Sequence, residues 1–120
     1  MTTSTEPTSH GFIEWRLEGR TEVPRLRVWC PWCCRWQDHN LDDAKPGQTV
    51  TRAVHCIAMD NTADTYAILV TNTPFPRVRS TVRESTYPQF RAIRRGVISP
   101  VVRTLRAQAR PVGTVHEVAR

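Results

Sequence analysis

Residues 28–40 read VWCPWCCRWQDHN and place three cysteines, three tryptophans and one histidine within thirteen positions. Cys30 and Cys33 form a C-x-x-C pair, whose short spacing lets both sulfur atoms face one ion. Such a pair could also serve as a disulfide, a redox centre or a thiol nucleophile. The rest of the chain has to distinguish among these four uses.

The sequence carries no sign of export to an oxidising compartment. No Lys or Arg precedes Arg16, no apolar run has the form of a signal peptide, and the apolar run at residues 67–70 is too short to span a bilayer. We therefore expect a soluble cytoplasmic protein. Stable disulfides are uncommon there, and a C-x-x-C pair more often binds a metal or takes part in catalysis.

Composition divides the 120 residues into four segments. Residues 1–11 and 111–120 lack a sustained apolar period, so we expect a disordered N-terminal tail and a flexible C-terminal tail. Residues 12–76 contain all four cysteines and many β-branched residues, which predicts a zinc-binding β-domain. Residues 77–110 predict a basic helical segment. An ordered body of this size often depends on a metal or on disulfides for its stability.

Alternating apolar and polar residues predict a hairpin that leads into the cysteine cluster. The expected strands are residues 12–17, 23–29, 49–59 and 66–71. Gly19 begins the turn of the hairpin, and the polar stretch at residues 35–48 predicts a loop or a short strand followed by a turn. We therefore expect a four-stranded antiparallel meander, which the two prolines of residues 73–76 bring to an end.

Two short helices are expected in the basic segment, at residues 88–95 and 100–110. Each has a proline in its first turn, Ser99 can cap the second helix, and Gly96 suits the end of the first. The expected fold is a small α+β protein. It has an antiparallel, zinc-ribbon-like sheet of about four strands, followed by one or two short C-terminal helices.

The thiol and imidazole groups are spaced to close a tetrahedral zinc site. Cys56 follows Cys33 after 22 intervening residues, a span that a strand, a turn and a strand can cover to return opposite the C-x-x-C pair. The predicted ligands are Cys30, Cys33, His39 and Cys56, with His55 as the alternative fourth ligand. Adjacent residues of a strand point to opposite faces, so His55 and Cys56 cannot both bind unless the backbone bends. Cys34 is the least suited, because it adjoins Cys33.

Two other uses of these residues stay open. A Cys–His nucleophile pair is one alternative, and a small buried hydrophobic role for Cys56 is the other. The spacing differs from that of a C₂H₂ finger, and a thioredoxin-type C-x-x-C begins a helix rather than following a hairpin. No paired carboxylates, G-x-S-x-G motif or glycine-rich phosphate loop supports another chemistry. We therefore expect no enzyme, and a Zn²⁺ site closed by four protein ligands.

Three features of the chain together resemble a set of small zinc-binding proteins. They are the motif C-P-W-C at residues 30–33, the histidine at His39 and the motif R-A-V-H-C at residues 52–56. The similar proteins are those of actinobacterial chromosomes, plasmids and phages, and the resemblance covers residues 28–70. It implies that the three cysteines of these motifs and one of the two histidines are metal ligands. It also implies an origin in actinobacteria or their mobile elements. Gln37 stands where the first histidine of the middle segment is usual.

Positive charge is concentrated in the last third of the chain. Residues 1–76 carry a net charge of −2 and residues 77–120 a net charge of +8. Arginine supplies sixteen of the seventeen basic residues and binds phosphate well, although a GC-rich coding genome also favours arginine. We expect a nucleic-acid-binding surface that contacts phosphates. Its predicted residues are Arg91, Arg94, Arg95, Arg103, Arg106 and Arg110.

A protein partner is the alternative to nucleic acid. A phage or mobile-element protein could bind and modulate a host protein, with the zinc-binding body as scaffold and the basic segment docking on an acidic surface. Neither alternative involves a membrane.

Overall fold

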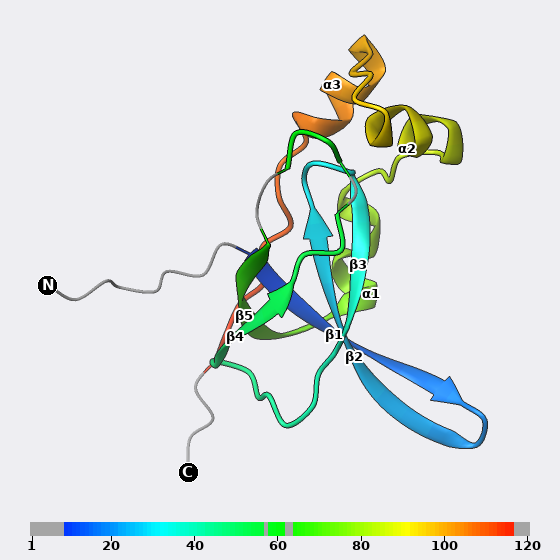
Figure 1. Cartoon of the computed structure of the whole chain (residues 1–120). Coiled ribbons are helices and arrows are strands. Elements are labelled where there is room, and N and C mark those ends of the chain that lie inside the picture. Colours follow the sequence, from blue (N-terminus) through cyan, green and yellow to red (C-terminus); the bar gives the residue numbers. More distant parts are fainter. Residues whose placement is uncertain (1–8, 57, 62–63, 117–120) are drawn as a thin grey trace, which may run out of the picture.

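The protein is a small α+β fold, in which a curled five-stranded sheet is accompanied by short helices (Figure 1). A computed structural model describes residues 9–56, 58–61 and 64–116. The strands are β1 (Ser9–Glu18), β2 (Thr21–Cys30), β3 (Arg35–Asn40), β4 (Thr49–Ala53) and β5 (Thr65–Pro74). The helices are α1 (Phe75–Val78), the 3₁₀ turn η1 (Arg79–Thr81), α2 (Tyr87–Arg94) and α3 (Pro100–Arg106). Most of the expected N-terminal tail, and residues 117–120 of the C-terminal one, lie outside the described residues.

The predicted hairpin is confirmed. Strands β1 and β2 pair antiparallel from Gly11 opposite Val28 to Glu18 opposite Thr21. Gly19 lies in the turn at φ +63°, a left-handed conformation that glycine adopts without steric cost. Strand β3 then returns along β2 after the turn that carries the cysteines. The polar stretch that predicted a loop or a short strand thus begins with a strand of six residues.

The expected antiparallel meander of four strands is wrong, because the sheet has five strands and is mixed. Its order is β3-β2-β1-β5-β4, and β5 runs parallel to β1. The chain crosses from β3 to the opposite edge of the sheet, where β4 and β5 form an antiparallel pair. Strand β1 offers a free edge there, and burying Ile68 and Val70 of β5 against Leu26 and Val28 favours this pairing.

Close packing at the parallel pair depends on Gly11. A Cβ atom at this position would lie 2.6 Å from Cδ1 of Leu26 and 2.8 Å from Cγ2 of Ile68. The missing side chain therefore lets Leu26 and Ile68, both fully buried, approach across β1. This contact joins the hairpin to β5.

Two apolar clusters lie on opposite faces of the hairpin. One is built from Leu26, Val28, Ile68, Val70 and Leu41, inside the curl of the sheet. The other is aromatic and packs the sheet against the helices. Its members are Phe12, Trp29, Cys34, Trp36, Phe75, Val78, Val82 and Leu105. Because Leu105 belongs to α3, this cluster places the helical segment over the cysteine-bearing turn.

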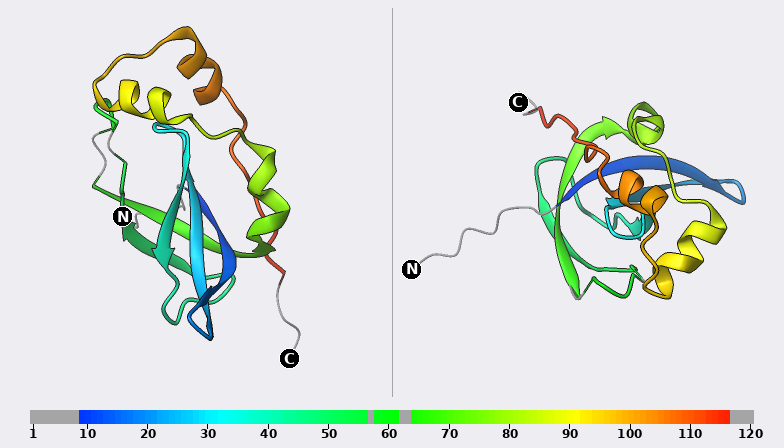
Figure 2. Two further views of the ribbon diagram at one scale, coloured as in Figure 1. Left: turned by 90° about the vertical axis from the view of Figure 1, so that its right-hand side faces the viewer. Right: turned by 90° about the horizontal axis from the view of Figure 1, so that it is seen from above.

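Both predicted helices are present, with one difference in length. Ser99 caps α3 by accepting a hydrogen bond from the backbone N–H of Val102, and Gly96 follows α2 at φ +80°. Helix α3 ends at Arg106 rather than at residue 110, so Arg110 lies beyond the helix that carries Arg103 and Arg106. Figure 2 shows the turn between β2 and β3 lying beneath α2 and α3. In the described part of the chain, no helix has the length and apolar character needed to cross a membrane.

Candidate metal centre

Three cysteine sulfur atoms from two separate segments meet at one point. The Sγ atoms of Cys30, Cys33 and Cys56 all lie within 4.8 Å of one another. In a tetrahedral zinc site with Zn–S bonds of about 2.3 Å, the sulfur atoms are about 3.8 Å apart. The three thiols are therefore close enough to share one ion after small side-chain adjustments.

The turn between β2 and β3 supplies the first two sulfur atoms. Cys30 ends β2, and the backbone N–H of Cys34 donates a 2.9 Å hydrogen bond to the carbonyl of Cys30. Cys34 takes a φ of +57° at the close of the turn, and its Sγ lies 3.7 Å from the carbonyl oxygen of Pro31 rather than in the sulfur cluster. The Cys34 side chain is instead buried in the aromatic cluster. This placement agrees with the expectation that Cys34 is the least suited ligand.

The third sulfur atom comes from the loop after β4. Strand β4 ends at Ala53, earlier than the expected strand at residues 49–59, and the chain then bends to carry Cys56 inward. A backbone hydrogen bond from Val54 to Asp64 closes the loop, and the N–H of Ala58 lies 3.4 Å from Cys56 Sγ. The bend frees Cys56 from the alternation of a regular strand. The sulfur therefore reaches the C-x-x-C pair from the opposite segment.

The thiol cluster favours a bound cation, because one of its three thiols has a lowered pKa. Hydrogen bonding to Cys30 raises the pKa of Cys33, and burial raises it further. Hydrogen bonds from Cys30 and Cys33 lower the pKa of Cys56, so a single thiolate is stabilised by two thiol neighbours. A divalent cation held by these three sulfur atoms would offset the repulsion among thiolates, and its binding would release protons.

His39 lies outside the sulfur cluster in this structure. It is 4% exposed, and its Nε2 atom is hydrogen-bonded to the hydroxyl of Tyr66. Burial lowers the pKa of His39 to about 4, with a further contribution from His55, so the ring is neutral at pH 7. The imidazole of His55 is exposed and its centroid lies 4.7 Å from that of His39. Among the described residues, the group of close metal-binding side chains thus contains the three predicted cysteines and neither predicted histidine.

Several polar side chains support the cysteine turn in a role that the sequence did not predict. The amide of Gln37 donates to Cys33 Sγ at 3.3 Å, in a buried contact. The hydroxyl of Ser85 donates to the carbonyl of Cys33 at 3.0 Å, and its N–H donates to the carbonyl of Cys34. Arg106 donates from Nε to the carbonyl of Trp32 at 2.9 Å. Gln37 carried a signal in the sequence as the position of a ligand-like histidine, and Arg106 was predicted only as a nucleic-acid contact, whereas Ser85 carried no signal.

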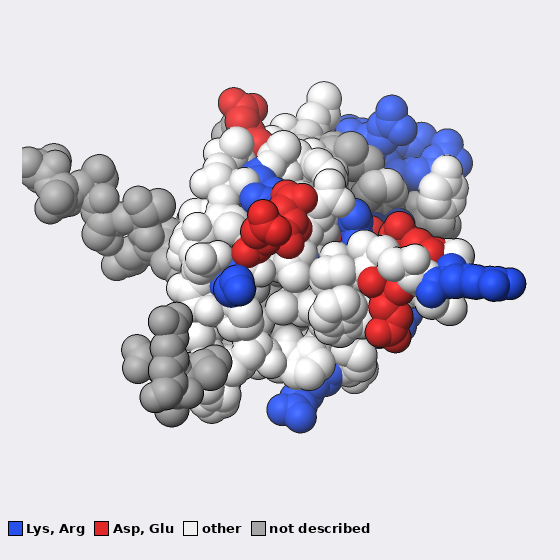
Figure 3. Space-filling model, turned by 90° about the horizontal axis from the view of Figure 1, so that it is seen from below, with Lys and Arg blue, Asp and Glu red and all other residues white. Residues whose placement is uncertain are grey.

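The predicted nucleic-acid-binding arginines separate into two groups. Five of them, Arg91, Arg94, Arg95, Arg103 and Arg110, have exposed side chains. Among the described residues none of these five has an acidic partner within ion-pair distance. Arg106 differs, because its guanidinium is paired with Asp60. Seen from below, Figure 3 shows one cluster of basic side chains at the upper right, while other basic side chains lie singly or beside acidic ones elsewhere on this face.

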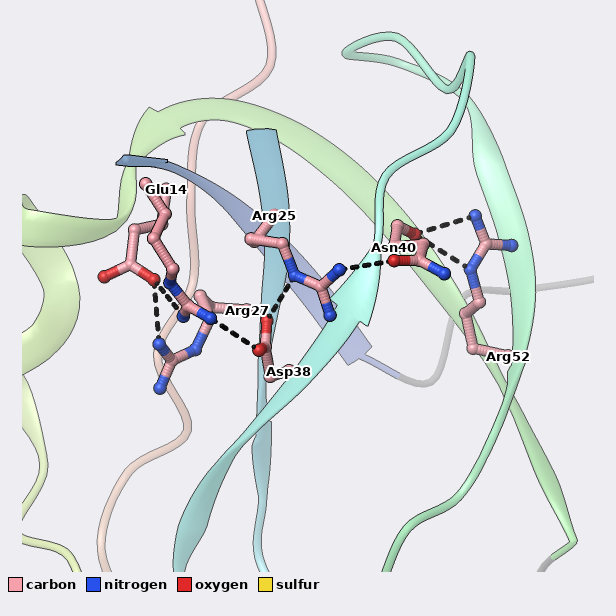
Figure 4. A network of polar contacts seen from close by, with 7 residues as sticks. Glu14, Arg25, Arg27, Asp38, Asn40 and Arg52 are labelled. Atoms are coloured by element: carbon pink, nitrogen blue, oxygen red, sulfur yellow. Dashed lines mark hydrogen bonds and ion pairs between the residues drawn. The ribbon is translucent and has the colours of Figure 1, made fainter. Parts of the chain in front are cut away.

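Four arginines of the sheet, Arg16, Arg25, Arg27 and Arg52, are instead paired with acidic side chains. Arg27 binds Glu14 at 2.8 Å, and Arg25 binds Asp38 at 3.0 Å, so the ion pairs link β1, β2 and β3 (Figure 4). Arg52 of β4 donates to the carbonyl of Asn40 at the end of β3. This side chain bridges the two edge strands, which the curl of the sheet brings near each other. These guanidinium groups stabilise the sheet.

No protein-family model matches the chain, and no curated protein or solved structure matches it.

Proposed function

We propose that the protein binds one zinc ion through Cys30, Cys33 and Cys56, and that this ion fixes the β2–β3 turn to the loop after β4. The meeting of three thiols from segments separated by more than twenty residues carries this proposal. Thiolate ligands favour Zn²⁺ over harder cations such as Mg²⁺ or Ca²⁺. The ion then joins two parts of a small sheet with limited buried surface, as in a zinc-knuckle protein.

We further propose that the zinc-stabilised body presents α2 and α3 to the phosphates of a nucleic acid. From residue 85 to residue 116 the chain has six arginines and no acidic residue. Five of these guanidinium groups are exposed and free of acidic partners within the described residues, which leaves their donors available for phosphate oxygens. Contacts of this kind give affinity with little base specificity.

Zinc content tests the first proposal. Protein purified without added metal is expected to contain about one zinc per chain, and a strong chelator should unfold it, because zinc binding contributes roughly 10–16 kcal/mol in structural zinc peptides. Cys56→Ala should lose the zinc. Cys34→Ala is the matched control, since it removes a buried thiol outside the cluster and should keep the metal. Less than half an equivalent in the parent protein would reject the site.

A protein partner is a second candidate, favoured by an apolar surface on the hairpin. Trp15 is 63% exposed and Leu17 is 66% exposed, and both lie on the same side of β1. Large exposed apolar side chains on one strand are common at protein interfaces. A pull-down with and without nuclease separates the two candidates. If a partner stays bound after nuclease treatment but is lost from the Trp15→Ser variant, the result favours protein recognition through the hairpin.

A further inference from the structure

The sulfur cluster supplies three ligands, whereas zinc in proteins takes four. The predicted fourth ligand, His39, is hydrogen-bonded to Tyr66, and its ring is buried there. Moving it to the cluster would leave the Tyr66 hydroxyl without this partner, which carries a cost when the group is desolvated. Among the described His, Cys, Asp and Glu side chains, none joins the three cysteines in this cluster, so a fourth ligand to a bound ion would have to come from elsewhere.

A cavity adjoins the cluster at Cys30. Its volume is about 210 Å³, and its walls include Cys30, Pro31, Trp32, Val54, Tyr66 and Arg110. Most of this lining is apolar, and the cavity is partly open to solvent. A cavity of about 150 Å³ is enough to hold a benzene molecule. There is room beside the cluster for a small organic ligand as well as for water.

One wall of the cavity carries a positive charge. Arg110 lies beyond the end of α3, is exposed, and has no acidic partner within ion-pair distance among the described residues. Because Arg110 lines the cavity, its guanidinium group favours an anionic ligand, which it can bind through charge-assisted hydrogen bonds. The two chemical requirements of the ligand are thus a metal-binding anionic end and a compact apolar body.

We propose that the fourth coordination position of the metal opens into this cavity and takes a small organic anion, such as a carboxylate with an aromatic ring, with Arg110 as a second contact. This inference rests on the proposed metal site. The sequence predicted a closed site with four protein ligands, whereas the proposed site is open at its fourth position. A ligand can then exchange at this position while the three cysteines keep the metal bound and the fold stable. Water occupies the position when no such anion is present.

Cobalt substitution tests the proposal, because the visible absorption of Co²⁺ reports its ligands and geometry. The Co²⁺-loaded full chain is titrated with benzoate, and with azide as an anion that lacks the apolar body. Benzoate is expected to change the cobalt spectrum in a saturable way and to bind more tightly than azide. Arg110→Gln should weaken benzoate binding about tenfold, whereas Arg103→Gln, an exposed arginine on α3 outside the cavity, should leave it unchanged.

The histidine variants decide between an open and a closed site. His39→Gln and His55→Gln are expected to leave the cobalt spectrum as it is in the parent protein. The proposal would be overturned if neither benzoate nor azide changed the cobalt spectrum, or if the spectrum of either histidine variant differed from that of the parent. Either result would favour a fourth ligand supplied by the protein. A chain that binds no cobalt and contains no zinc would instead reject the metal site on which the proposal rests.

Discussion

The Nε atom of Arg106 lies 2.9 Å from the carbonyl oxygen of Trp32, one of the two residues between the cysteines of the C-x-x-C pair. The same guanidinium group donates at 3.0 Å to Asp60, which follows Cys56 in the other half of the cluster. One side chain of α3 therefore holds both segments that supply the sulfur atoms. The helices and the metal centre are consequently expected to stabilise each other.

Replacing Arg106 with glutamine should weaken this connection. The change removes an ion pair with Asp60 and a charge-assisted hydrogen bond to Trp32, in a site where the Arg106 side chain is 19% exposed. We expect a loss of about 1–2 kcal/mol in the free energy of unfolding, together with weaker zinc binding. Urea unfolding of the zinc-loaded protein and a competition titration with a chelator measure the two effects. Arg103→Gln is the control, and equal behaviour of the two variants would show that Arg106 does not support the centre.

Acidification should destabilise the fold through His39. Its pKa falls from 6.5 in the unfolded chain to about 4 in the folded one, so the unfolded chain binds the proton first as the pH drops. Stability is unaffected above pH 6.5 and decreases as the pH falls from 6.5 to about 4, by up to ~3 kcal/mol. In His39→Gln the amide can still hydrogen-bond to Tyr66 but does not titrate.

The measurement is the difference in unfolding free energy between parent and His39→Gln across this pH range. Loss of metal at low pH affects both proteins and largely cancels in the difference. The parent should lose its advantage between pH 6.5 and 4. A difference that stays constant with pH would contradict a neutral, buried His39.

Nucleic-acid binding through α2 and α3 should depend strongly on salt. Each arginine that contacts a phosphate releases counterions, so Arg94→Gln, Arg95→Gln and Arg103→Gln should each reduce the slope of log K against log salt by about one. Fluorescence anisotropy with a labelled oligonucleotide at several salt concentrations measures the slope. Arg20→Gln makes the same change of charge in the hairpin turn and should leave the slope unaltered. Binding that is insensitive to salt would exclude this surface as a phosphate contact.

A methyl group at Gly11 should be poorly tolerated. Alanine usually stabilises a strand position relative to glycine, because glycine loses more conformational entropy on folding. Here the added Cβ would lie 2.6 Å from Leu26 and 2.8 Å from Ile68, in a part of the core without space. We expect Gly11→Ala to lower the free energy of unfolding by about 1–3 kcal/mol. An increase in stability, measured by urea unfolding, would mean that β1 and β5 can separate slightly at no cost.

The local sequence pattern was sufficient to predict the structural elements that depend on residues close together in the chain. The alternation of residues 12–17 and 23–29 predicted the hairpin, the prolines and caps predicted α2 and α3, and the C-x-x-C spacing predicted a turn with two inward sulfur atoms. Each of these features is encoded within fewer than twenty consecutive residues. Cys56 was also expected to return opposite the C-x-x-C pair, because a strand, a turn and a strand can cover the 22 intervening residues, and its sulfur atom does lie in the cluster.

Only the tertiary structure decided how the segments meet. The parallel pairing of β5 with β1 depends on contacts between residues nearly sixty positions apart, and no local periodicity distinguishes it from an antiparallel meander. In the same way, His39 meets Tyr66 rather than the sulfur atoms, and Arg106 meets Trp32 and Asp60 rather than solvent. The sequence determined which side chains were available for a metal site. Long-range packing decided which of these side chains reach the sulfur cluster. The hydrophobic effect is proportional to the apolar area removed from water, so it depends on how whole surfaces pack together and not on any single residue.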